Sequence, residues 1–144
     1  MSPHEFFLDR GLGRGVADGL RANGWVVHRI TDHFPNDAQD VPDEEWLDHG
    51  LARGWVPLCK DGRIKGRHHE REPLVVRSAV LFYLNNQQLR RDEMIARFER
   101  ARMAIERAVE RGGPAVYAVT ETTVRRVWPE SPTFRSRESN AQEL

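Results

Sequence analysis

Three aspartates stand where carboxylates could act together in this chain. Asp9 directly follows a run of three apolar residues, Asp61 lies two residues past another apolar run, and Asp43 opens a predicted helix with Glu44 and Glu45 beside it. Carboxylates gathered at one place repel one another and raise each other's pKa unless a cation joins them. Oxygen ligands of this kind suit Mg²⁺ or Mn²⁺. The pattern therefore indicates a metal site at which activated water attacks phosphorus in line.

Two of these aspartates also have ordinary structural roles open to them. Asp43 could serve as the N-cap of the helix that it begins, and Asp61 before Gly62 is common turn chemistry. Asp9 is harder to explain in this way because it ends an apolar run. A metal site and these structural roles stay open as alternatives for Asp43 and Asp61.

Short apolar runs alternate with longer amphipathic segments, and this alternation predicts the elements that position the aspartates. Strands are expected at 5–8, 25–30, 55–59, 79–84, 115–120 and 123–127, and helices at 10–23, 43–53, 63–72 and 91–111. The order strand, helix, strand favours parallel pairing through right-handed crossovers. We therefore predict an α/β fold with a mostly parallel central sheet flanked by helices. Ligands of such sheets bind beyond the carboxyl ends of the strands, where Asp9 and Asp61 are expected.

Prolines and charges refine this prediction. Pro57 lies inside the third predicted strand and favours an edge or irregular position for it. Pro73 is expected to stop the helix over 63–72. On the long helix over 91–111, Glu93 and Arg97 have the spacing of an ion pair on an exposed face.

The remaining aromatic and histidine residues give weaker signals. Trp46 and Trp55 lie within apolar runs, so we assign both to the core rather than to base stacking. His28, His33 and His49 have no matched partners by spacing.

Composition bounds the class of protein. Cys59 is the single cysteine among 144 residues, which excludes an internal disulfide framework or a cysteine-based zinc site and indicates a reducing, cytoplasmic compartment. No run approaches the ~20 apolar residues of a membrane span. We expect no signal peptide, one domain over residues 1–130, and a flexible C-terminal tail over 131–144.

A net charge of zero hides an uneven distribution. Residues 1–62 hold 11 acidic and 6 basic side chains, whereas residues 63–144 hold 11 acidic and 16 basic ones. Arginine, which fits phosphate in a bidentate manner, supplies nearly all of the positive charge. An acidic part joined to a basic part suits metal ions together with a polyanion, although an ordinary enzyme could show the same split.

The order of these motifs resembles a known family. The segments FFLDRGLGRGVADGLRANGWVVHRITD and DEEWLDHGLARGWVPLCKDGRI, residues 6–32 and 43–64, are similar to the PIN-like domains of the VapC-type toxin group. Such domains begin with a strand that ends in Asp, and later carry an acidic helix start, a strand and a Thr/Ser-x-Asp turn. The remainder of the chain matches only in its succession of strands and helices.

The resemblance implies a ribonuclease that depends on Mg²⁺ or Mn²⁺ and acts as the toxin of a toxin–antitoxin pair, with an antitoxin protein as partner. Carried over to this chain, Asp9, Asp43 and Asp61 would bind the metal, and Glu44 would assist them, with Glu45 as the alternative. Basic side chains beside these carboxylates could track the RNA backbone: Arg10, Arg14, Arg63, Lys65 and Arg67. A solvated surface that neutralises nearby aspartates is the alternative for this basic set. The oligomeric state stays open, with a homodimer as one alternative.

The sequence departs from the family pattern at two positions. Cys59 replaces the hydroxyl residue of the Thr/Ser-x-Asp turn, and Arg63 stands where many PIN domains carry a fourth acid. A missing fourth ligand favours one tightly held metal or weak activity, and Arg63 could instead hold the phosphate. A catalytically inactive module that binds RNA or a protein is the main alternative. An enzyme acting on a phosphorylated metabolite is the second.

Overall fold

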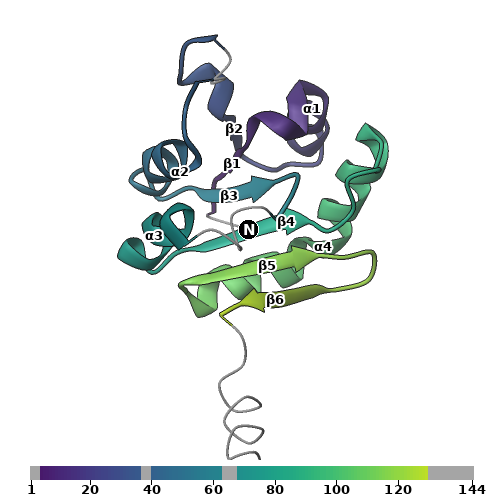
Figure 1. Cartoon of the computed structure of the whole chain (residues 1–144). Coiled ribbons are helices and arrows are strands. Elements are labelled where there is room, and N and C mark those ends of the chain that lie inside the picture. The colour runs from purple at the N-terminus through teal and green to yellow at the C-terminus, as the bar shows by residue number, and fades with distance from the viewer. Residues whose placement is uncertain (1–3, 37–39, 63–67, 130–144) are drawn as a thin grey trace, which may run out of the picture.

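The computed structural model describes residues 4–36, 40–62 and 68–129. It contains six strands, four α-helices and two 3-10 turns (Figure 1). In chain order these are β1 (Phe6–Leu8), η1 (Arg10–Leu12), α1 (Gly13–Ala22), β2 (Val27–Arg29), η2 (Ile30–Asp32), α2 (Asp43–Leu51), β3 (Val56–Cys59), α3 (His68–Arg77), β4 (Val80–Leu84), α4 (Arg91–Arg111), β5 (Ala115–Val119) and β6 (Val124–Trp128).

All six strands form one sheet in the order β2-β1-β3-β4-β5-β6. The strands β1 to β5 are parallel, and β6 runs antiparallel to β5. The chain begins at β1, continues to β2 on one side, and then crosses to β3 on the other side. The winding direction therefore reverses between β1 and β3, where open α/β sheets bind their ligands. The predicted α/β fold with a mostly parallel sheet is confirmed.

Helices cover both faces of the sheet. Helices α1 and α4 pack together on one face, and α2 and α3 pack together on the other (Figure 1). The strand β4 shows the consequence: Val80, Phe82 and Leu84 belong to the core under α1 and α4, whereas Leu81 and Tyr83 belong to the core under α2 and α3. Burial on both faces explains why its sequence is apolar throughout instead of alternating.

Trp25 ties the turn after α1 to α4. Its indole Nε1 donates a hydrogen bond of 2.6 Å to Oε2 of Glu99, and the guanidinium carbon of Arg102 lies 4.9 Å from the centre of its ring. Arg102 also donates to the carbonyl oxygens of Asn23 and Gly24. These contacts fix α1 beside α4 and so set the position of the loop that leads from β1 into α1.

The prediction that Pro57 marks an edge or irregular strand is wrong, because β3 lies in the middle of the sheet. The amide of Val56 donates to Glu5 O at 2.8 Å, and Leu58 O accepts from the amide of Asp9 at 3.1 Å. Both flanking residues therefore direct their peptide groups toward β1, and the nitrogen of Pro57 faces β4. The β3–β4 ladder begins only at Leu58, so the missing donor interrupts no ladder bond.

Pro73 does not stop a helix, which contradicts the second proline prediction. It lies inside α3, and the helix continues to Arg77. The proline removes one backbone hydrogen bond. Pro73 and Leu74 are both buried, and Leu74 is fully enclosed in the core under α2 and α3. Burial of this apolar pair offsets the lost hydrogen bond. This effect comes from tertiary packing, which the helix propensity of proline does not take into account.

Arg97 is not part of an exposed ion pair with Glu93, as its spacing had suggested. Its side chain is 8% exposed, and Nη1 donates to Oδ1 of Asn85 at 2.7 Å and to Val119 O at 3.5 Å. Glu93 instead accepts a hydrogen bond from the amide of Arg90 at the start of α4. Arg97 therefore holds the ends of β4 and β5 to α4.

Within the part of the chain that the structure covers, no helix is long and apolar enough to cross a membrane. The predicted tail over 131–144 lies outside the described residues.

Gly50 of α2 lies against the ring of Phe7, which is fully buried in β1, and a Cβ at Gly50 would overlap ring atoms. We expect Gly50→Ala to lower the free energy of unfolding by about 1–3 kcal/mol, the usual effect of overpacking. Gly19→Ala is the matched control, since the atoms it meets lie toward the end of the half-exposed Ile95 side chain, which can rotate away. Urea denaturation of both variants tests this, and equal stabilities would contradict it.

Candidate active site

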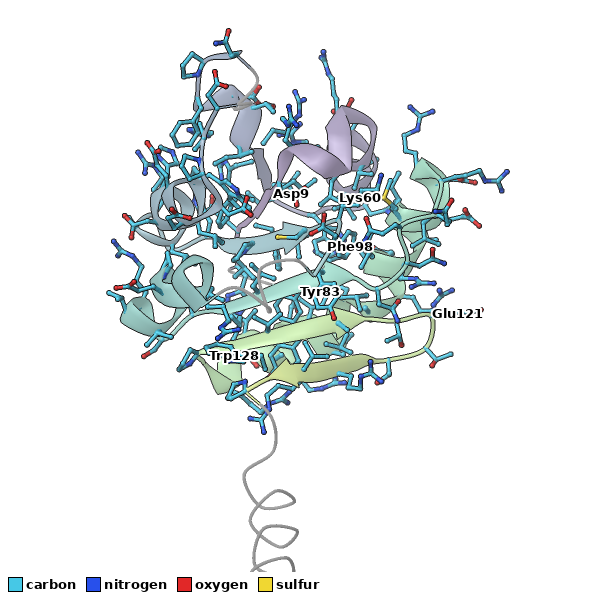
Figure 2. All side chains as sticks on the ribbon, in the orientation of Figure 1. Asp9, Lys60, Tyr83, Phe98, Glu121 and Trp128 are labelled. Carbon is cyan, nitrogen blue, oxygen red and sulfur yellow. The ribbon has the colours of Figure 1, made fainter. Side chains whose placement is uncertain are left out.

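Asp9 occupies the point at which the winding of the sheet reverses. It follows β1, and its amide donates to Leu58 O of β3 at 3.1 Å. Its carboxylate accepts one hydrogen bond from the amide of Lys60 and one from the amide of Leu12, both at 3.2 Å. Figure 2 shows Asp9 and Lys60 close together at the ends of the central strands. The side chain is therefore held by backbone groups from both neighbouring loops.

Burial raises the pKa of Asp9 from 3.8 to about 6. Loss of hydration is the main cause, and the nearby charge of Asp61 adds to it. The amides of Lys60, Leu12 and Gly11 oppose the shift because they stabilise the ionised carboxylate. Asp9 is thus a desolvated carboxylate that has amide donors but faces a second negative charge.

The Cys59 thiol lies beside Asp9 and is affected by all three predicted aspartates. It is buried and hydrogen-bonds to the Asp9 carboxylate. The pKa of the thiol is raised well above its ordinary value by burial and then by the charges of Asp9, Asp43 and Asp61. Cys59 is thus a small core residue of the sheet. The fold brings three carboxylates that are far apart in the sequence within electrostatic reach of this one thiol.

The oxygen donors at this site fit a hard divalent cation such as Mg²⁺ or Mn²⁺. Among the residues that the structure describes, however, no group of three or more His, Cys, Asp or Glu side chains is arranged to hold a metal ion. Mg²⁺ usually keeps several waters and binds through one or two carboxylates together with substrate phosphate. Asp9 and Asp61, whose charges interact, are the pair that fits this mode. The charge of Asp43 acts on the Cys59 thiol but is not among the causes that shift the pKa of Asp9.

Asp43 is the first residue of α2, and Pro42 occupies the N-cap position, so the alternative role of Asp43 as N-cap is wrong. Its Oδ1 accepts a hydrogen bond of 2.8 Å from the indole of Trp46 one turn later, which fixes the carboxylate. Glu44 lines a hollow between α2 and α3 together with Asp48, and its role as a helper stays a prediction.

The turn after β3 is tight because Gly62 packs against β4. A Cβ at Gly62 would lie 2.6 Å from Cε2 of Tyr83, which is buried. Glycine at this position therefore lets the turn approach β4 closely and sets the path of the backbone beside Asp61.

The structure describes only two of the five basic residues that we predict to contact RNA. Arg10, which follows Asp9 directly in the sequence, and Arg14 are both exposed, and Arg14 lies 3.9 Å from Asp18 in an ion pair. Arg63, Lys65 and Arg67 lie outside the described residues.

Two contributors to this site were missed by sequence reasoning. Lys60 donates its amide to Asp9, and Gln87, in the loop after β4, donates its side-chain amide to Lys60 O at 2.9 Å. The turn sequence around Lys60 could have suggested the first contact. Nothing in the sequence links Lys60 to Gln87, because only the pairing of β3 with β4 brings them together.

The histidines without matched spacing also meet in the fold. His28 stacks on Trp55 with 3.7 Å between ring centres, and His33 lies 5.1 Å from His49 on the same measure. Trp55 is half-buried within this aromatic group, whereas Trp46 is buried in the core as predicted. Burial and the charges of Arg53 and His33 lower the pKa of His49.

The sequence of the chain is similar to those of known proteins. A family model described as "PIN like domain" matches residues 4–86. The chain is 30% identical over 123 residues to "Putative ribonuclease VapC45" of Mycobacterium tuberculosis, a match that covers 84% of this chain and 89% of that protein. No solved structure gives a significant match.

Without divalent metal, the contribution of Asp9 to the stability of the fold should fall as the pH rises from about 4 to about 6. The folded state keeps a proton on Asp9 up to about pH 6, whereas the unfolded chain releases it near 3.8. The stability that this proton provides is therefore lost across that window. Urea denaturation of the wild type and of Asp9→Asn in EDTA tests this. A stability difference between the two proteins that does not change with pH would contradict it.

Cys59 should resist alkylation in the folded protein. Its thiol is 1% exposed and stays protonated because its pKa is raised, and the thiolate is the reactive form. Mass spectrometry after iodoacetamide treatment at pH 8 should show modification only in denaturant. Rapid labelling of the native protein would show that the site around Asp9 opens readily.

Proposed function

The chain belongs to the family of PIN-like domains, and from that premise we propose that it is a metal-dependent endoribonuclease that hydrolyses RNA phosphodiesters. One observation carries the proposal: the half-buried Asp9 carboxylate lies at the reversal point of the sheet beside the charge of Asp61. A cation is the simplest group that would let both carboxylates stay ionised at neutral pH.

Mg²⁺ or Mn²⁺ is the cofactor that we propose for this site, with Asp9, Asp43 and Asp61 as its ligands. Such a cation supplies Lewis acidity, which activates water and offsets negative charge on a phosphate. The chain's own groups do the positioning. The amides of Lys60 and Leu12 orient the Asp9 carboxylate, and the Trp46 indole orients that of Asp43.

The basic side chains near the site would position the substrate. Arg10 and Arg14 are exposed at the start of α1, where they can reach phosphate groups without leaving the helix surface. Contacts of this kind hold the RNA backbone in register and carry little sequence information. The choice of RNA target would then depend on contacts to the bases.

We propose further that the protein is the toxin of a toxin–antitoxin pair. This rests on the similarity to a protein named as a VapC ribonuclease, which extends over most of both chains. The partner would be an antitoxin protein that occupies or distorts the site around Asp9.

An inactive module that binds RNA or protein is the second candidate. It is favoured by the lack of a three-ligand arrangement among the described residues. Metal affinity separates the two candidates, since an inactive descendant has no need to bind Mn²⁺.

We expect purified protein to cut a panel of structured RNAs with Mn²⁺ or Mg²⁺ and not with EDTA. Asp9→Asn should lower the rate by more than the roughly 10–100-fold that is typical for a partner outside the inner ligand shell. The change keeps the shape of the side chain and removes the charge that would hold the cation. Gel analysis of end-labelled RNA measures the rates.

Asp48→Asn is the matched control, because Asp48 is exposed on α2 and pairs with Arg77 away from Asp9. It should cut RNA as the wild type does. Cutting that survives Asp9→Asn would reject the proposed site. Absence of cutting together with absence of Mn²⁺ binding by calorimetry would favour the inactive module.

A further inference from the structure

A second cationic surface lies away from Asp9. Helix α4 and the turn between β5 and β6 enclose a groove of about 340 Å³. We name it the arginine groove after four lining residues, Arg97, Arg100, Arg107 and Arg111, which span 14 positions or about 21 Å of helix. Its floor includes Ala101 and Ala104, and its other wall is the segment 120–124. Glu121 on that wall is the one carboxylate among the lining residues.

The positive charge of this groove is not neutralised by the protein itself. Arg97 donates to the neutral oxygens of Asn85 and Val119, and within the described part of the chain Arg100, Arg107 and Arg111 form no ion pair. Arg102 on the same helix differs, since it lies 3.8 Å from Glu99 and 3.9 Å from Glu106. Arg100, Arg107 and Arg111 thus line one wall with their charge available to a ligand, whereas Arg97 is 8% exposed and held by its two oxygen partners.

The arginine groove is continuous with the carboxyl ends of the strands, where Asp9 lies. A hollow of about 550 Å³ at the ends of β4 and β5 is lined by residues 85–88 together with Arg97 and Glu121, so it shares members with the groove. Gln87 of that hollow donates to Lys60 O, and the amide of Lys60 donates to Asp9. In Figure 2, Glu121 lies at the tip of the β5–β6 turn, on the side toward which β3, β4 and β5 point in Figure 1. A polar path therefore leads from Asp9 over the strand ends to the arginines.

We propose that the arginine groove binds the phosphate backbone of the RNA whose cleavage we assign to Asp9, and so lengthens the substrate site along α4. This inference rests on the proposed function. Successive arginines along one helix suit a polymer with a charge on every unit. The amide-lined hollow of residues 85–88 offers donors and acceptors to sugars and bases between the two sites. An acidic polypeptide would satisfy the charge, but it would not need the path back to Asp9.

The test is RNA binding in EDTA, where no cleavage occurs, measured by fluorescence anisotropy with a labelled single-stranded RNA at several salt concentrations. The combined variant Arg100→Gln, Arg107→Gln and Arg111→Gln removes three exposed charges. We expect its affinity to fall at least about tenfold and its salt slope to fall by about 2, since each phosphate contact with a single strand contributes about 0.7. Arg97 is left in place because it holds the strand ends to α4.

The control variant is Arg53→Gln, Arg77→Gln and Arg125→Gln, which removes the same charge elsewhere. Arg53 lies just after α2 and Arg77 at the end of α3, near the ends of β3 and β4 at which these strands begin. Arg125 pairs with Ala118, which belongs to the core under α2 and α3, so Arg125 lies on the face of the sheet away from α4. The control variant should keep the wild-type salt slope. An equal loss in both variants, or an unchanged slope in the groove variant, would overturn the proposal. Matching circular dichroism spectra and melting temperatures establish that the variants fold, and Arg107→Gln alone serves if the combined variant does not.

Two further measurements, RNA cleavage and binding of an acidic polypeptide, separate this proposal from the proposed nuclease activity and from a protein-binding role. RNA binding that depends on the groove, with no Mn²⁺-dependent cleavage by the wild type, would reject the nuclease and leave the groove standing. Cleavage by the wild type with a groove variant that binds RNA normally would reject the groove alone. If binding of labelled poly-glutamate, and not of RNA, requires the three arginines, the groove serves an acidic protein and the proposal is wrong.

Discussion

The placement of one buried carboxylate between two strands organises the whole candidate site. Asp9 ends β1, bonds to β3 through its amide, and receives amide hydrogen bonds from Lys60 and Leu12. Burial of an ionised group is costly unless hydrogen bonds or opposite charges compensate it. Backbone amides compensate Asp9 only in part, as its raised pKa shows. The folded chain therefore carries a local electrostatic cost at the point where a cation would relieve it.

The rest of the fold makes this arrangement possible. Phe7 is buried beneath Gly50 of α2, so that β1 lies under the helix that supplies Asp43. On the other face, Trp25 and Arg102 hold the turn after α1 against α4. The strand that precedes Asp9 and the turn after α1 are thus each anchored by a large buried side chain. Preorganisation of this kind is what lets carboxylates with mutual repulsion stay close in the folded state.

Substrate recognition in this protein would be divided between two surfaces that differ in charge and in exposure to solvent. The carboxylates around Cys59 form a half-buried, negative site that would need a cation before it could accept phosphate. The arginine groove along α4 is exposed and positive, and it can attract a polyanion directly. Arg97 links the two, because it ties the ends of β4 and β5 to the helix that carries the other arginines.

The sequence by itself determined the succession of elements and the parallel sheet, because apolar periodicity is a local signal, and it proposed Asp9, Asp43 and Asp61 as candidate site residues. The helix over 91–111 was predicted with its correct bounds. Pro57, Pro73 and Arg97 were misjudged, since strand order and helix packing decide which backbone donor is dispensable and which charge is buried. Only the tertiary structure placed Gln87 beside Lys60 and gathered His28, His33 and His49 around Trp55. Such contacts join residues from separate elements, and the energy that forms them comes from burial across the sheet, which no short stretch of sequence encodes.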